Sequence, residues 1–380
     1  MKNNTYIDVH ILQTLPPSNI NRDDTGAPKQ AIYGGANRLR VSSQSWKRAT
    51  RLAFAPTEEG GNAGRRTKRL PELLTEALED RGVSTEEAHK IGSAFLPALE
   101  IKAGRKGDDS SYLLFFGTGQ LARFADKIVE LLNSDQVAQD TDPQEVIKLA
   151  DPRKAFSSGH SLDVALFGRM VADLADLNVD ASVQVAHAIS THEAEILTDY
   201  YTAVDDIVQE SDDETGAGMI GVTEFNSATL YRFASLGLEQ LVENLDQDRT
   251  TAVRGVEAFI RAFTLSMPSG FANSFAPRTR PALVLVTVRQ DQPVNLVSAF
   301  EKPVPKNLQK GYEAASVEEL ANTYTEECER WGDTPVLTVA SYRTLEDKKV
   351  KEAVEDSLGQ SVPMEDLLSQ VRQTLEGLDQ

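Results

Sequence analysis

The chain has 380 residues with 40% hydrophobic content, enough to bury the core of one large domain or of two to three smaller ones. Its formal net charge of −19 argues against a nucleic-acid partner unless positive charge gathers locally. The single cysteine, Cys328, excludes an internal disulfide. MKNNTYIDVH has no signal segment and no apolar run is long enough to span a membrane, so the sequence predicts a soluble cytoplasmic protein.

The first elements in chain order are a strand and a long loop. Residues Thr5–Leu12 alternate apolar and polar side chains, which predicts a half-buried strand. The loop that follows, Gln13–Gln30, contains three prolines and one glycine, and loops of that length tend to be functional. A short second strand, ended by glycines, is expected at Ala31–Gly35.

A helix is expected next, beginning after Ser42 or Ser43. The side-chain oxygen of either serine can accept an otherwise unpaired N–H group of the first turn. A helical projection separates two faces. One face carries Gln44, Lys47, Arg48 and Arg51, and the other, which is expected to pack inward, carries Trp46, Ala49 and Ala53.

The rest of the chain mixes inserted helices with strands. Helical segments are expected within Leu70–Leu132 and Pro143–Leu174, after a polar loop at Thr57–Arg69. The segments TDYYTAVDDIVQ and GVTEFNSATLYRFASL are expected to form a protruding β-hairpin with an acidic tip at Glu210–Gly218. After a further helix come the most hydrophobic strand and three helical or mixed segments: Ala282–Val288, Val317–Trp331, Leu345–Leu358 and Pro363–Leu378. This order of elements predicts an α+β fold with insertions.

Positive charge is concentrated in one part of the chain. Thr25–Arg69 contains ten Lys or Arg and two acids, a local net of +8, so the remainder of the chain carries −27. Within it, Gly34–Arg51 has five basic residues and no acid. Because only charges within about a Debye length, roughly 8 Å at physiological salt, set the potential at a surface, an acidic total does not exclude a basic groove.

The same stretch predicts an anion-binding site. Arg38 and Arg40 alternate in an extended segment and are expected to project together. The following helix is expected to add free N–H groups and the positive end of its dipole. Several donors in a row suit a polyanion better than a single phosphate, and the alternative is a solvated basic helix face. The helix contributes Ser42, Ser43, Gln44, Lys47, Arg48 and Arg51 to this predicted site.

Other motifs give weaker indications of chemistry. GTGQLA, at Gly117–Ala122, matches the relaxed dinucleotide pattern G-x-G-x-x-A, but no βαβ series surrounds it, so an ordinary strand-to-helix turn is favoured. His187 and His192, with Glu193 and Glu195, have H-x4-H-E spacing, which favours ordinary polar or core histidines over a metal site. With Gln44 three residues before Lys47, the Ser-x-x-Lys nucleophile pattern is missing. No catalytic residue, metal or cofactor is expected.

Two adjacent tyrosines lie in the first arm of the expected hairpin. Tyr200 and Tyr201 are aromatic, and such side chains near a protruding hairpin can stack on bases at roughly 1–3 kcal/mol per base. The alternative is packing of alternate side chains into the core, which we expect for one of the pair. Ile220, at the base of the acidic tip, is placed to act with them as an apolar wedge.

Ordered blocks throughout the chain resemble the CasC family, the repeated backbone subunit of the type I-E CRISPR surveillance complex called Cascade, in the RAMP superfamily. These blocks are INRDD, KQAIYGG, RLRVSSQSWKRATR, GRM, HAISTHE, YYTAVDD, GVTEF, LYRFASLGLEQL and VSAFEK. The resemblance implies an RRM-like (ferredoxin-like) palm, a helical fingers insertion and a β-hairpin thumb. It places the palm at residues 1–56, 181–197 and 227–380, the fingers at 57–180 and the thumb at 198–226.

The same resemblance implies a subunit that is not an enzyme. Copies would polymerise along the spacer of a CRISPR RNA (crRNA), alongside other Cascade subunits, and hold it for pairing with target DNA while a separate helicase-nuclease cuts. A docking role on a neighbouring copy is expected for the acidic tip, Glu210–Glu214. The alternatives from other classes are a nucleotide-dependent enzyme using GTGQLA and a structural subunit whose basic strip binds acidic protein. The implied RNA contacts are Arg22, Lys29, Ser42, Gln44, Lys47 and Arg51 to the backbone, Met170 near a kinked nucleotide, and Tyr200, Tyr201 and Ile220 as the thumb wedge.

Overall fold

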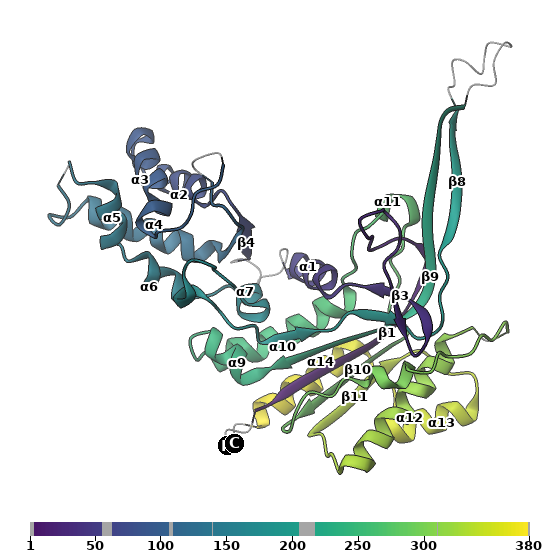
Figure 1. Cartoon of the computed structure of the whole chain (residues 1–380). Coiled ribbons are helices and arrows are strands. Elements are labelled where there is room, and N and C mark those ends of the chain that lie inside the picture. The colour runs from purple at the N-terminus through teal and green to yellow at the C-terminus, as the bar shows by residue number, and fades with distance from the viewer. Residues whose placement is uncertain are drawn as a thin grey trace. The chain divides into compact units, whose positions relative to one another are not determined.

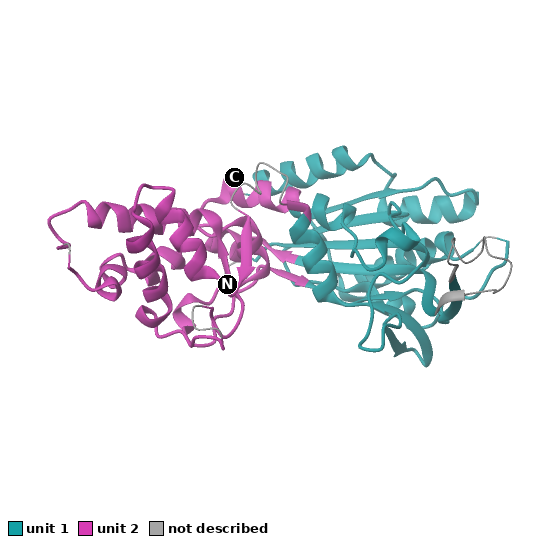
Figure 2. Cartoon of the chain, turned by 90° about the horizontal axis from the view of Figure 1, so that it is seen from above, with its two compact units in different colours: residues 1–52, 185–235, 259–380 teal, residues 53–184, 236–258 magenta. Residues whose placement is uncertain are grey.

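The computed structural model describes residues 4–54, 63–105, 109–138, 140–204, 217–309 and 311–378, with the backbone alone at residues 203–204 and 217–220. The chain forms two compact units, coloured separately in Figure 2. Unit 1 contains residues 1–52, 185–235 and 259–380, and unit 2 contains residues 53–184 and 236–258. The acidic tip Glu210–Glu214 lies outside the described residues.

Unit 1 is built on a large sheet with strand order β11-β10-β1-β9-β7-β3-β2, and β6 and β8 also pair with β9 (Figure 1). The pairs of known register are antiparallel, as in β1 with β10, where Tyr6 lies opposite Arg289. The strands are β1 (Tyr6–Ser18), β2 (Gln30–Tyr33), β3 (Ala36–Val41), β6 (Val183–Val185), β7 (Ala188–Ser190), β8 (Leu197–Val204), β9 (Ala217–Gly237), β10 (Leu283–Arg289) and β11 (Leu337–Tyr342). This antiparallel sheet with helices confirms the predicted α+β class at the level of a mixed fold.

Strand β1 differs from the half-buried strand that its alternating pattern predicted. It continues to Ser18 and is buried at every position from Ile7 to Gln13. The polar members of the alternation face other protein groups instead of water: His10 Nδ1 lies 2.9 Å from the Tyr231 hydroxyl, and Asp8 accepts a hydrogen bond from the Val294 N–H. The half-buried assignment is therefore wrong, because β1 is a central strand with both faces covered.

The two faces of the sheet are covered by different helices. Tyr231 and Phe233 of β9 join one apolar cluster with η2 (Leu296–Phe300), α12 (Glu313–Trp331) and α13 (Lys348–Leu358). Between them, Arg232 points to the opposite face, where its guanidinium lies 3.7 Å from the ring centroid of Trp46 in α1 (Ser43–Phe54). The Arg232 guanidinium also donates to Gln13 Oε1 at 2.6 Å. Helix α1 is thus anchored on the sheet through Trp46.

The remaining helices of unit 1 lie in the C-terminal half of the chain, and one of them, α10, has residues 249–258 in unit 2 and residues 259–265 in unit 1. Arg261 of α10 forms paired hydrogen bonds of 2.6 Å with Glu365 of α14. These helices have the bounds α10 (Arg249–Leu265), α11 (Ala272–Phe275) and α14 (Met364–Gly377).

Unit 2 is a helical unit with one two-stranded antiparallel sheet, formed by β4 (Gly64–Thr67) and β5 (Leu114–Gly117). Phe95, Phe124 and Phe156 meet in its apolar core, with ring centroids 5.5–6.0 Å apart. The predicted insertion, residues 57–180, lies within this unit, which also includes residues 236–258. Its helices are α2 (Leu70–Glu79), α3 (Thr85–Ala98), α4 (Thr118–Leu132), α5 (Pro143–Leu149), α6 (Pro152–Ser157), α7 (Leu162–Phe167), η1 (Ala175–Leu177) and α9 (Leu238–Asn244). Across the described residues, no helix of either unit has the length and apolar character needed to cross a membrane.

Candidate nucleic-acid interface

Helix α1 begins with Ser42 as its N-cap, as predicted: the Ser42 hydroxyl accepts the Ser45 N–H at 3.3 Å. The backbone donors at this end are engaged by the protein itself. The Ser42 N–H donates to Asn21 Oδ1 at 2.8 Å, and the Ser43 N–H donates to His187 Nδ1 at 3.2 Å. The expectation of free N–H groups is therefore wrong for these residues, because the side chains of Asn21 and His187 already accept them.

The predicted basic face of α1 reaches the surface. Gln44 and Arg48 are exposed, and Lys47 and Arg51 are half-buried beside them. Burial lowers the pKa of Lys47, since a partly desolvated ammonium is less favourable. Two consecutive turns of α1 therefore present polar or cationic side chains along one side of the helix.

The inward face of α1 is only partly the predicted one. Trp46 is fully buried, as expected, but Ala49 and Ala53 are half-buried. Thr50 and Phe54 are the other buried residues, four and eight positions after Trp46. The Thr50 hydroxyl lies 3.2 Å from that of Ser266. The contact stripe thus follows i, i+4 spacing, which fixes the basic residues on the outer side.

Arg38 is not part of this surface, and the prediction that it binds a phosphate is wrong. Its side chain is 0% exposed. The guanidinium donates to the backbone carbonyls of Ser190 at 2.8 Å, Phe300 at 2.8 Å and Glu301 at 3.2 Å. Arg38 therefore ties β3 to β7 and to the end of η2.

Lys29 and Arg40 lie next to the start of α1. The Lys29 N–H donates to the Asn21 carbonyl at 3.0 Å, and the Lys29 carbonyl accepts the Arg40 N–H at 2.8 Å. The half-buried Arg40 side chain donates to the Gln30 carbonyl at 3.2 Å and to His187 Nδ1 at 3.3 Å. Asn21 links Lys29 to the start of α1, because its carbonyl accepts the Lys29 N–H and its side-chain Oδ1 accepts the Ser42 N–H.

A tight turn allows this arrangement. β2 and β3 are joined by Gly34 and Gly35, both with positive φ (58° and 76°), the geometry of a two-residue hairpin that glycine favours. A Cβ on Gly34 would lie 1.6 Å from the Glu301 carbonyl oxygen, so Gly34 is required by close approach as well as by its backbone angle.

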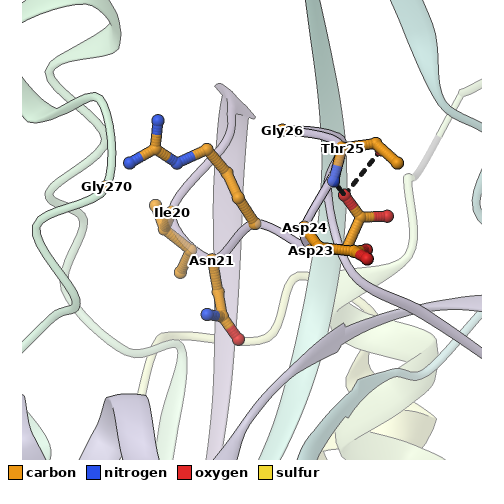
Figure 3. Close-up of a pocket in the computed structure, with 8 residues that line it drawn as sticks. Ile20, Asn21, Asp23, Asp24, Thr25, Gly26 and Gly270 are labelled. Atoms are coloured by element: carbon orange, nitrogen blue, oxygen red, sulfur yellow. Dashed lines mark hydrogen bonds between the residues drawn. The ribbon is translucent and has the colours of Figure 1, made fainter.

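Arg22 is exposed, and its guanidinium lies 4.6 Å from the ring centroid of Phe271. It borders an open pocket of about 520 Å³, part of which is shown in Figure 3. Asp23 holds the loop beside it by accepting from the Thr25 N–H and hydroxyl, which lowers the pKa of Asp23. The pocket carries acids as well as Arg22, so Arg22 is its cationic component. The lining residues are Ile20, Asn21, Arg22, Asp23, Asp24, Thr25, Gly26 and Gly270.

Met170 lies in unit 2 and is 79% exposed, although both its neighbours in sequence are buried. Arg169 exchanges two backbone hydrogen bonds with Val179, of 2.8 and 2.9 Å, and its guanidinium donates to the Leu177 carbonyl at 2.7 Å. The Val171 N–H donates to Asn178 Oδ1 at 2.6 Å. The backbone on either side of Met170 is thus fixed, and its thioether is presented to solvent.

The hairpin of β8 and β9 extends away from the sheet of unit 1 (Figure 1). Tyr200 is 60% exposed and Tyr201 is 45% exposed, so the expectation that one of them packs into the core is wrong. Tyr200 pairs with the exposed Val222, and Tyr201 pairs with Gly221, where an added Cβ would meet the tyrosine ring at 2.3 Å. The backbone of Ile220 pairs with Thr202, but its side chain is outside the described residues.

Neighbouring residues on a strand point to opposite sides of a sheet, so the register divides the predicted wedge between two faces. Tyr200 and Val222 share one face with the Cα position of Ile220, and Tyr201 lies over Gly221 on the other.

The alternative motifs do not form sites. GTGQLA spans the end of β5 and the start of α4, and β5 pairs antiparallel with β4, so the turn lies outside any βαβ unit of the described chain. The buried Gln120 side chain accepts the Gly117 N–H at 3.1 Å and donates to the Ser158 carbonyl at 2.7 Å, which fills the turn. His192 is buried with its ring stacked on Tyr312 at 3.6 Å. Among the described residues, no group of three or more His, Cys, Asp or Glu is arranged to hold a metal.

A family model described as CT1975-like protein matches residues 7–370 of the chain. The chain belongs to the CT1975-like family. This CT1975-like chain is also similar to two chains of solved structures titled "CRISPR RNA-guided surveillance complex, pre-nicking" and "CRISPR RNA-guided surveillance complex". The first is 31% identical with a TM-score of 0.79, over 97% of this chain and 100% of that chain. The second is 28% identical with a TM-score of 0.67, over 96% and 99% of the two chains. No curated protein sequence matches the chain.

Sequence reasoning missed two residues of this interface. Asn21 and His187 accept backbone donors at the start of α1, although both lie far from it in sequence. The one signal for them was their presence in the blocks INRDD and HAISTHE, which carried the family resemblance.

Proposed function

We propose that this CT1975-like chain is the crRNA-binding backbone subunit of a type I-E Cascade complex. The observation that carries the proposal is helix α1, which is anchored by the buried Trp46 and presents Gln44, Lys47 and Arg48 outward. Lys29 and Arg40 lie beside its first turn. The likeness to chains of CRISPR RNA-guided surveillance complexes, at 31% identity over nearly the whole chain, supports RNA as the polyanion.

The mechanism follows from which groups the protein offers. Lysine and arginine side chains contact phosphates, which carry no sequence information, so any spacer sequence can be held. The base edges stay free, and specificity is left to Watson–Crick pairing between the crRNA and target DNA, as in other RNA-guided systems. The subunit has no catalytic role in this proposal. Copies polymerise side by side along the spacer, other Cascade subunits complete the complex, and a recruited helicase-nuclease cuts the DNA.

The exposed hairpin supplies the thumb in this proposal, and unit 1 and unit 2 supply palm and fingers. Tyr200 and Val222 form an apolar pair on one face of the hairpin, on which a base can stack. Pushing that pair between bases would unstack one step at a cost of a few kcal/mol, offset by the new contacts. Met170, presented on a fixed backbone in unit 2, would lie near a kinked nucleotide.

A salt titration with two unrelated single-stranded RNAs tests the phosphate contacts. We expect Lys47→Ala to weaken binding of both RNAs by the same factor and to reduce the slope of log K against log salt by about 0.7, the value for one phosphate on a single strand. The control is Lys127→Ala in α4, which removes an exposed lysine paired with Glu130 at 3.0 Å and should leave both quantities unchanged.

Two outcomes would contradict the proposal. Loss confined to one RNA sequence would mean that Lys47 takes part in base readout. Failure of the unaltered chain to bind either RNA would remove the RNA-binding role and favour a structural subunit whose basic strip binds acidic protein.

A further inference from the structure

His187 is exposed and lies in the loop before β7, next to the predicted backbone contacts. Its Nδ1 receives two hydrogen bonds, from the Ser43 N–H at 3.2 Å and from Arg40 Nη1 at 3.3 Å. A backbone amide and a guanidinium can only donate, so Nδ1 must be the acceptor. The ring is therefore neutral, and its single proton lies on Nε2.

The remaining ring nitrogen is positioned to donate. Within the described part of the chain, no residue forms a hydrogen bond with Nε2. The groups around the ring are cationic or helix-terminal: Arg40 on β3, Lys29 on the preceding loop and the positive end of the α1 dipole. These surroundings favour an anionic acceptor for the Nε2–H group.

We propose that His187 is an RNA-contacting residue that donates from Nε2 to a phosphate oxygen while its Nδ1 caps helix α1. The contact rests on the proposed function. The imidazole covers the Ser43 N–H, which therefore cannot donate to a phosphate. The Nε2–H group offers a side-chain donor farther from the helix in its place. Because the ring stays neutral, the donor adds a directed hydrogen bond without adding charge.

The pKa of His187 agrees with a neutral ring. Partial desolvation of the ring, followed by the nearby positive charges of Arg40 and Lys29, lowers this pKa. A histidine whose folded pKa lies below its unfolded value stabilises the native state at pH above the unfolded value, about 6.5, and this contribution is lost as the pH falls. Protonation of Nδ1 would remove both hydrogen bonds that it accepts.

Two substitutions separate the cap from the donor. In His187→Asn, the amide oxygen takes the place of Nδ1 and nothing takes the place of Nε2. We expect an unchanged urea midpoint, an RNA Kd raised about tenfold and an unchanged salt slope, because a neutral hydrogen bond to an anion is lost. His187→Phe removes both functions and should lower the urea midpoint as well. His89→Asn, at an exposed histidine in α3, is the matched control and should change neither.

Three results would overturn the inference. If His187→Asn binds RNA as tightly as the unaltered chain, His187 is a helix cap and nothing more. If the substitution reduces the salt slope by about 0.7, the bound form is the imidazolium. If the unaltered chain gains RNA affinity between pH 8 and pH 6 and His187→Asn does not, the charged ring is again the ligand. Failure of the unaltered chain to bind RNA at all would instead refute the proposed function, and this inference with it.

Discussion

Replacement of Arg38 by methionine distinguishes an internal tie from an RNA ligand. The substitution leaves three backbone carbonyls, those of Ser190, Phe300 and Glu301, without the guanidinium that now donates to them. Each buried acceptor that loses its partner costs about 1–3 kcal/mol. Burial already lowers the pKa of Arg38, so removing the charge recovers part of that cost, and methionine fills much of the volume. The expected net loss is about 3–5 kcal/mol in the free energy of unfolding of unit 1.

Tryptophan fluorescence in a urea titration measures this loss. Both tryptophans of the chain, Trp46 and Trp331, belong to unit 1, and Trp46 is buried against Arg232. The control is Arg48→Met, which alters an exposed residue of α1 and should change stability by less than about 0.5 kcal/mol while weakening RNA binding. If Arg38→Met unfolds at the urea concentration of the unaltered chain and loses RNA affinity, the assignment of Arg38 as an internal tie is refuted.

Two further substitutions test the sheet of unit 1. Burial raises the pKa of Asp8 to about 6, above its unfolded value, so the native state loses stability as the pH rises from about 4 to 6. Relative to the unaltered chain, Asp8→Asn should therefore gain up to about 3 kcal/mol over that range in urea titrations, and a constant difference would contradict the buried carboxyl. Gly34→Ala should lower the free energy of unfolding by more than about 2 kcal/mol, because its Cβ would meet the Glu301 carbonyl oxygen. At Gly35 an added Cβ meets nothing within 4 Å, so Gly35→Ala should lower it only by the roughly 1–2 kcal/mol of backbone strain. Equal losses at the two glycines would argue against that close approach.

The sequence predicted the elements whose signals are local. The serine cap and basic face of α1 follow from side-chain types at 3.6-residue spacing, and α2, α3 and the fully buried β10 were recognised from apolar patterning. No sequence pattern predicted β11. This edge strand is only six residues long and mostly half-buried, which gives a weak alternation signal.

The predictions from the sequence were wrong where a tertiary contact decides the role of a residue. Alternation correctly placed Arg38 in an extended strand, but it could not show that η2 covers that face and supplies carbonyl acceptors. The half-buried strand predicted for β1 would expose Asp8 and His10, and it fails for the same reason, because both side chains are buried by other elements. The caps contributed by Asn21 and His187 come from segments distant in sequence, which no local pattern reveals.

In the proposed function, the cationic side of α1 holds the sugar-phosphate backbone of RNA, whatever the base sequence. This is tested most directly by co-expressing the chain with crRNAs that carry several unrelated spacers. The purified chain is treated with ribonuclease, and the RNA fragments that survive are sequenced. We expect protected fragments that cover each spacer to a similar extent, and we expect these fragments to be lost when Lys47 and Arg48 are replaced by alanine. Protection of one spacer sequence alone, or protection that persists in the double variant, would contradict the proposed function.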